Sequence, residues 1–153
     1  MKKLTILILA MSFVLSSCST NRGEGTAFHD QDIHFKLLKS TSSEQKRTYE
    51  IEVTNTGKAT IGYINFYLSY PFLQSNGAME NPYKIECITN DIQPIILKSG
   101  EKVVYRVSAP ITEVFGNKSL LDFTNPNIEL KGYVKVGGKD SPFGMSGNLE
   151  AFL

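Results

Sequence analysis

The side chains best suited to chemistry gather in one short segment, His29-Asp30-Gln31-Asp32-Ile33-His34. Two imidazoles and two carboxylates in such a segment could hold a divalent metal ion. In an extended chain, however, His34, Asp32 and Asp30 share one face and His29 points to the other, because successive side chains alternate. A solvated polar segment is therefore the favoured interpretation. Metal binding or sensing through His29, Asp30, Asp32 and His34 is the alternative.

The chain has two cysteines, Cys18 and Cys87. Cys87 lies in the alternating stretch Tyr83-Lys84-Ile85-Glu86-Cys87-Ile88, far along the chain from both histidines. A nucleophilic cysteine needs a base beside it. We therefore expect Cys87 to be a small buried hydrophobe rather than a reactive thiol.

Other catalytic patterns are missing from the sequence. It contains no Gly-x-Ser-x-Gly elbow, no Gly-x-Gly-x-x-Gly fingerprint and no phosphate-binding loop ending in Gly-Lys-Ser,. Glu50 and Glu52 alternate with apolar residues, so their carboxylates should face solvent rather than flank a cleft of the kind that glycosidases need. We predict no catalytic residues, no cofactor and no enzymatic activity.

Composition narrows the class of protein further. The 153 residues carry 16 Lys and Arg against 15 Asp and Glu, and 41% of them are apolar. A net charge of +1 gives no broad grip on phosphate backbones, so nucleic-acid binding is not expected,. The balance of apolar and charged residues also argues against a disordered chain or a membrane bundle. One domain of ordinary size is expected.

The N-terminus has the organisation of an export signal. A positive start, Met1-Lys2-Lys3, precedes Leu4–Leu15, where only Thr5 and Ser12 are polar. Twelve residues are too few for a membrane span, which needs about 20,. A buried core helix should show a polar face, and this run has none. Small residues then lead into a cysteine in Leu15-Ser16-Ser17-Cys18.

These residues resemble the lipobox of bacterial lipoproteins. The resemblance implies that residues 1–17 are removed and that the Cys18 thiol receives a diacylglyceryl group, with fatty acylation of the new amine. The mature protein would then be lipid-anchored at the cell membrane or the outer membrane, on the extracytoplasmic side. With Cys18 lipidated, no disulfide within the chain is possible. Residues 18–30 read as a flexible tether with an r.m.s. reach of about 20 Å, leaving 31–153 for the folded domain.

The elements that must follow the tether alternate with the period of β-strands. Strands are predicted in seven segments and, weakly, in an eighth: Ile33–Leu37, Thr48–Thr54, Ile61–Tyr70, Tyr83–Ile88, Ile92–Leu97, Val103–Ser108, Ile128–Val136 and Leu149–Leu153. Helix signals are poor, and only Asn117–Phe123 could form a short helical turn. Seven or more short strands with turns between them predict an all-β, two-layer antiparallel β-sandwich, Ig-like in topology.

Three stretches resemble small Ig-like modules of exported bacterial lipoproteins. Tyr49–Gly57 and Ile64–Tyr70 look like the second and third strands of such modules, the latter loosely following the FxLYD-type pattern, and Leu97–Glu101 with Val103, Tyr105 and Val107 resembles the turn and strand that follow. The resemblance implies a module that binds or spaces other components of the cell envelope.

One strand departs from plain alternation. In Ile61–Leu68, the side chains of Ile64, Phe66 and Leu68 fill one face, while Ile61, Tyr63 and Tyr67 are expected on the other. We take Tyr63 and Tyr67 as the candidate surface for an envelope protein or a glycan; a covering loop is the alternative. The sequence thus predicts a membrane-anchored, non-enzymatic binding or accessory module.

Overall fold

The computed structural model describes residues 28–74, 77–111 and 120–153. The export signal, the lipobox and Cys18 lie outside these residues, as does most of the tether. Across the described ranges, no helix is both long and apolar enough to cross a membrane.

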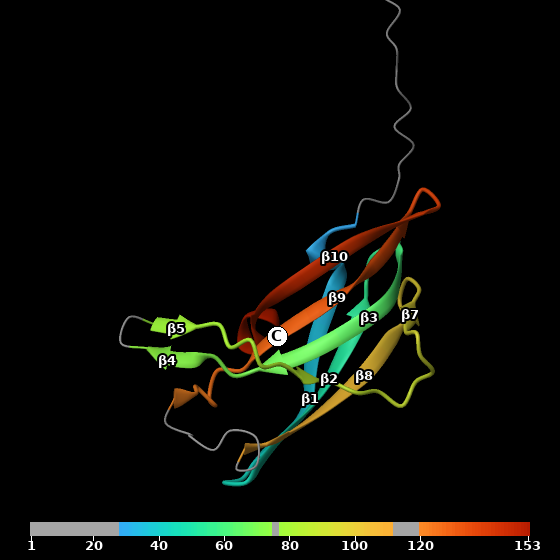
Figure 1. The fold of residues 1–153 in the computed structure, drawn as a ribbon. Helices are drawn as coiled ribbons and strands as arrows, with labels where there is room; N and C mark the ends of the chain where they lie inside the picture. Colours follow the sequence, from blue (N-terminus) through green and yellow to red (C-terminus); the bar gives the residue numbers. More distant parts are fainter. Residues whose placement is uncertain (1–27, 75–76, 112–119) are drawn as a thin grey trace, which may run out of the picture.

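Two antiparallel sheets form the domain (Figure 1). The first sheet has the order β1-β2-β8, built from Ile33–Ser42, Lys46–Asn55 and Lys102–Pro110. The second has the order β10-β9-β3-β6, with β7 also paired to β3; its strands are Lys139–Asn148, Asn127–Val136, Thr60–Ser69, Ile85–Glu86 and, for β7, Ile96–Leu97. A small ribbon of β4 (Phe72–Gln74) and β5 (Gly77–Met79) projects from the far end of β3. The 3₁₀ turns η1 (Asp30–Asp32) and η3 (Leu149–Phe152) flank the strands.

The predicted all-β, two-layer antiparallel sandwich is confirmed. The first two strands share a sheet with β8, and β3 shares the other with β9 and β10, which is the Ig-like arrangement,. Alternation makes the core, because every second residue of a strand points inward. The largest fully buried side chains come from both layers and include Ile51, Phe66, Tyr70, Tyr105 and Leu130.

Several expected strands differ in the structure. Leu149–Phe152 is a 3₁₀ turn rather than a strand, because the Asn148 side chain accepts a hydrogen bond from the Glu150 N–H at 2.9 Å and starts a turn. The segments expected to be strands at 83–88 and 92–97 are strands only over β6 and β7, although Ile88 also forms an isolated antiparallel bridge with Arg106. The expected helical turn at 117–123 begins outside the described residues.

One long strand was not predicted at all. β10 carries Pro142 and two glycines, which strand propensity disfavours,. It pairs with β9 along its whole length and is a sheet edge, where proline is tolerated,. Its partly buried Phe143 and Met145 pack against the core and supply the alternation.

A buried asparagine joins the turns at one end of the sandwich. Asn55 is fully buried, and its side-chain N–H groups donate to the Ala59 and Leu97 carbonyls at 2.8 and 3.0 Å. Its side-chain oxygen accepts from the Gly57 N–H at 3.0 Å. The β2–β3 turn and the segment before β8 are therefore held together by one residue.

Candidate functional site

A β-bulge near the start of β3 shapes the outer face of the second sheet. Gly62 pairs with Tyr133 and Asn65 with Lys131, so Tyr63 and Ile64 together oppose the single residue Gly132 on β9. Such a bulge bends the strand and redirects side chains. Tyr63 has φ +56°, and it is the one non-glycine residue with positive φ in the described part of the chain.

Two backbone features hold the bulge in place. The Tyr63 N–H donates to the Ile95 carbonyl at 2.9 Å, which ties the bulge to the segment entering β7. Gly132 is buried, and a Cβ there would lie 3.0 Å from the Gly62 carbonyl oxygen. Only glycine accepts this approach without a shift of backbone.

The bulge changes which residues of β3 face outward. Ile61 was expected on the outer face with Tyr63 and Tyr67, and this is wrong, because Ile61 is only 1% exposed and lies in the core. The extra residue of the bulge lets both Ile61 and Ile64 point inward. Tyr63 is 57% exposed, and Tyr67 is half-buried further along the same strand.

Tyr63 lies in an exposed apolar surface made from three strands. Its ring meets the ring of Tyr133 on β9 edge to face, with centroids 6.2 Å apart and planes at 86°. Beside them, Ile96 on β7 is also exposed, and the three side chains line a hollow of about 170 Å³. Lys135 and Asp140 at its margin add charges of opposite sign.

The apolar surface continues onto the loop before β7. Ile92 is 91% exposed, and with Ile96 it lines a second, shallow hollow of about 340 Å³. Ile96 lines both hollows, so the two are adjacent. We call Tyr63, Tyr133, Ile96 and Ile92 together the Tyr63 surface.

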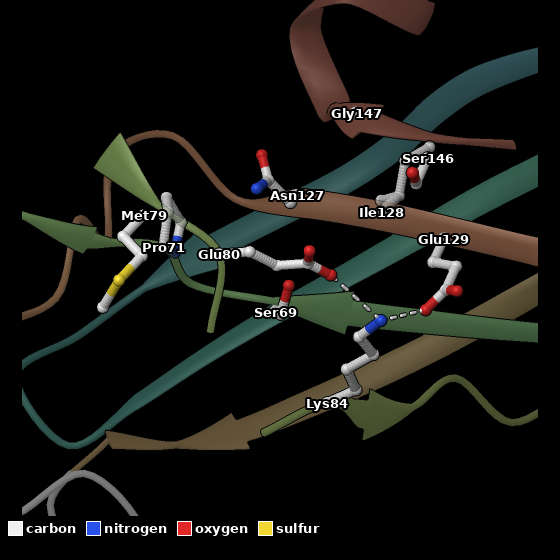
Figure 2. Close-up of a pocket in the computed structure, with 10 residues that line it drawn as sticks. All are labelled: Ser69, Pro71, Met79, Glu80, Lys84, Asn127, Ile128, Glu129, Ser146 and Gly147. Atoms are coloured by element: carbon white, nitrogen blue, oxygen red, sulfur yellow. Dashed lines mark hydrogen bonds and ion pairs between the residues drawn. The ribbon is translucent and has the colours of Figure 1, made fainter. Parts of the chain in front are cut away.

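A polar pocket of about 190 Å³ lies near the other end of β3 and β9 (Figure 2). Lys84 projects between two carboxylates, with its Nζ 3.3 Å from Glu80 and also bonded to Glu129. Lys131 bonds to the other oxygen of Glu129. The four charges cancel, and the ion pairs fasten the segment before β6 onto β9.

The pKa values in this cluster follow from its contacts. The hydrogen bond to Glu129 raises the pKa of Lys84, against partial burial that lowers it. Burial by itself raises the pKa of Glu129, but the hydrogen bonds from Lys131 and Lys84 outweigh it and leave that pKa below its ordinary value of 4.5. A carboxylate held ionised by two lysines is a poor general acid or base at neutral pH. The geometry therefore favours a structural clamp.

The segment from His29 to His34 shows no preformed metal site. The Asp32 carboxylate accepts the His29 backbone N–H at 3.0 Å and covers Gly57, so it serves the local turn. Among the described residues, no three side chains of His, Cys, Asp or Glu lie together as metal ligands. No observation therefore favours the metal-binding alternative.

Cys87 is buried, as its position predicted. Its backbone N–H donates to the Phe66 carbonyl at 2.8 Å, and its side chain belongs to the core cluster. Burial raises the pKa of the thiol far above neutrality, which suppresses the reactive thiolate,.

Sequence reasoning found Tyr63 but missed its neighbours. Tyr133 could have been found, because it alternates with the buried Val134 and so had to face outward. Ile92 and Ile96 were assigned to a strand, and nothing local signals their exposure. Their exposure follows from the shortness of β7, which pairs over only two residues.

Comparison with known proteins finds no family model and no curated protein that matches the sequence. A Pseudomonas fluorescens alkylpurine DNA glycosylase, AlkC, bound to DNA is similar in structure over 80% of this chain and 32% of its own, with 12% identity and a TM-score of 0.38. The Bacillus subtilis sporulation control protein Spo0M matches over 76% of this chain and 47% of its own, with 11% identity and a TM-score of 0.36.

A Kluyveromyces marxianus β-glucosidase matches over 76% of this chain and 14% of its own, with 15% identity and a TM-score of 0.33. The chain thus spans less than half of each of these three proteins. With every TM-score below 0.4, the likenesses carry no information about the activity of this chain.

Proposed function

We propose that the chain is a lipid-anchored extracytoplasmic lipoprotein whose Ig-like sandwich is a non-enzymatic binding or accessory module for another component of the cell envelope. Its anchor would be lipid on Cys18, at the cell membrane or the outer membrane. The apolar leader and Leu15-Ser16-Ser17-Cys18, which resemble a lipoprotein signal, support export and lipidation. The resemblance of the domain to FxLYD-type modules supports the accessory role.

The conformation of Tyr63 is the observation that carries the binding role. A non-glycine residue in the left-handed region costs about 1–2 kcal/mol. That cost secures little burial, because the ring remains 57% exposed beside Tyr133 and Ile96. The strained residue forms the bulge that lets Ile61 and Ile64 both enter the core, and the same bulge turns an aromatic side chain outward. Strained backbone of this kind clusters at functional sites. A rigid, amphipathic tyrosine is also the side chain that contact surfaces favour.

Lipidation is tested by metabolic labelling with a fatty acid. Cys18→Ala should abolish labelling and leave the precursor uncut, because the thiol that carries the lipid is gone. Cys87→Ala is the matched control and should be labelled as the wild type is. Normal labelling of the Cys18 variant would rule out the anchor.

The contact role is tested by crosslinking at the cell surface. Tyr63→Ser/Tyr67→Ser should lose capture of the contacted component while stability falls by about 2 kcal/mol or less, because Tyr63 is exposed and Tyr67 is only half-buried,. Leu38→Ser, an exposed position on β1 in the other sheet, is the control and should keep capture. Undiminished capture by the tyrosine variant would place the contact elsewhere.

A further inference from the structure

We infer that the component contacted by the Tyr63 surface is the lipid bilayer itself, with Ile92 and Ile96 inserted among zwitterionic headgroups and Tyr63 and Tyr133 at their level. The inference rests on the proposed lipid anchor at Cys18. It goes further by assigning an orientation to the domain on the membrane. The sandwich would rest on its anchoring membrane through one defined end.

The place where the tether joins the domain sets how far the domain can move away. Phe28 packs against Phe143 on β10, with ring centroids 4.9 Å apart, so the tether is already fixed at residue 28. Ten peptide steps separate Cys18 from Phe28. Ten residues of any chain span at most about 35 Å, and the tether predicted from the sequence would have an r.m.s. reach of about 17 Å. β3 alone is about 33 Å long at about 3.3 Å per residue, so a tether with this r.m.s. reach would hold the domain within about half of that length from the membrane on average.

The Tyr63 surface borders the end of the sandwich at which the chain enters. The Asp32 carbonyl, four residues after Phe28, accepts the Thr56 N–H of the β2–β3 turn at 2.8 Å. Asn55 in turn accepts the Gly100 N–H at 2.7 Å and donates its own N–H to the Glu101 carbonyl at 3.0 Å. Gly100 and Glu101 line the same hollow as Ile92 and Ile96. In Figure 1, β7 and the β9–β10 hairpin lie on one side of the molecule, and β4 and β5 project from the opposite side.

The side chains of the surface suit a bilayer interface. Branched aliphatic chains at a loop tip, such as the 91% exposed Ile92, gain most when they leave water for an apolar phase,. Tyrosine is enriched where headgroups meet acyl chains, because its ring is apolar and its hydroxyl is polar. Exposed Lys98 directly precedes the turn before β8, and exposed Lys139 directly follows the β9–β10 turn. Long side chains at such positions can keep their ammonium groups in the headgroup layer.

The charges around the surface indicate which lipid it suits. Lys135 and Asp140 border the first hollow, and Asp91, Glu101 and Lys102 border the second. Acidic and basic groups are thus nearly balanced. Electrostatic attraction to anionic headgroups requires an excess of basic residues. Because the charges are nearly balanced, we infer that the surface contacts zwitterionic lipid by inserting its apolar side chains.

The test places a fluorescent thiol label at single positions of the full lipidated protein, reconstituted in phosphatidylcholine vesicles that contain brominated lipid. Ile92→Cys and Ile96→Cys probe the surface. Leu73→Cys on β4, which is 52% exposed at the other end of β3, is the matched control. The native thiols do not interfere, since Cys87 is buried with a raised pKa and Cys18 carries the lipid.

Labels at 92 and 96 should lose more than about half of their fluorescence, because an inserted apolar face lies about 5–10 Å below the interface. The label at 73 should keep its fluorescence, and part-replacement of phosphatidylcholine by phosphatidylglycerol should change neither result. Vesicle-bound protein with no quenching at 92 and 96, or with equal quenching at 73, overturns the inference and leaves the lipoprotein proposal standing. Absence of lipid on Cys18 by mass spectrometry overturns both. The labels at 92 and 96 could instead stay unquenched in vesicles and become shielded from solvent only in native membranes, which carry other envelope proteins and glycans. That result would assign the surface to such a partner and would contradict the inference.

Discussion

At Tyr63 we expect the glycine variant to be more stable than the alanine variant, which is the reverse of the usual order in a strand. At an ordinary strand position, glycine is less stable than alanine by about 0.5–1 kcal/mol, because glycine loses more backbone freedom on folding. At Tyr63 the φ of +56° should reverse this order. Alanine keeps a left-handed strain of about 1–2 kcal/mol, whereas glycine has none.

The expected magnitudes follow from the contacts of Tyr63. Both variants lose the edge-to-face contact with Tyr133, which is worth about 0.5–1.5 kcal/mol. Tyr63→Ala, which keeps the strain, should therefore be destabilised by about 1 kcal/mol. Tyr63→Gly removes the strain but adds the smaller cost of the backbone entropy that glycine loses on folding. Its free energy of unfolding should therefore be close to that of the wild type. The glycine variant is thus expected to be more stable than the alanine variant by about 0.5–1 kcal/mol.

The assay is urea unfolding of the unlipidated chain of residues 19–153, followed by far-UV circular dichroism. A difference of about 1 kcal/mol changes the folding equilibrium roughly fivefold and is measurable when the slopes agree. Tyr133→Gly and Tyr133→Ala are the matched control pair on β9, where φ is not positive and alanine should be the more stable. If alanine exceeds glycine at both positions, Tyr63 is not held in the left-handed region, and the argument from strain to function fails.

Two further predictions concern the residues that hold the ends of the sandwich together. Asn55→Ala should lower the free energy of unfolding by about 3 kcal/mol, because the Ala59 and Leu97 carbonyls and the Gly57 N–H lose their partner in a buried place,; a loss below about 1 kcal/mol by urea unfolding would contradict this. Because the folded-state pKa of Glu129 is lowered, its contribution should be complete above its ordinary 4.5 and lost as the pH falls through the folded-state value,. The stability difference between wild type and Glu129→Gln should therefore shrink on acidification, and a difference that grows at low pH would refute the assigned ion pairs.

Strands that are buried on one side only could be predicted from the sequence. In β2, Tyr49, Ile51 and Val53 point inward between polar residues, so alternation places the strand and its faces together,. β10 fails this test, because an edge strand needs few apolar residues and tolerates Pro142,. The strand predicted at the C-terminus is wrong for a different reason. The apolar pattern there is too short to distinguish a strand from a turn, and the side-chain cap from Asn148 starts the 3₁₀ turn Leu149–Phe152.

The candidate surface could be predicted only in part. Alternation brings Tyr63 outward, but it also placed Ile61 there, because a period of two takes no account of an inserted residue,. The bulge depends on a residue nearly 70 positions away in sequence, Gly132, whose missing side chain admits the Gly62 carbonyl. No local pattern around Tyr63 contains that information.

Gly132 also links the surface to the tether. A Cβ on Gly132 would lie 3.0 Å from the Gly62 carbonyl oxygen on one side and 2.9 Å from the Phe143 ring on the other. The first contact belongs to the bulge that turns Tyr63 outward. The second belongs to the ring on which Phe28 packs as the tether enters the domain. Because one buried glycine borders both, the direction in which the surface points and the place where residue 28 joins the domain depend on the same packing contacts. The proposed membrane contact requires such a fixed relation between the two.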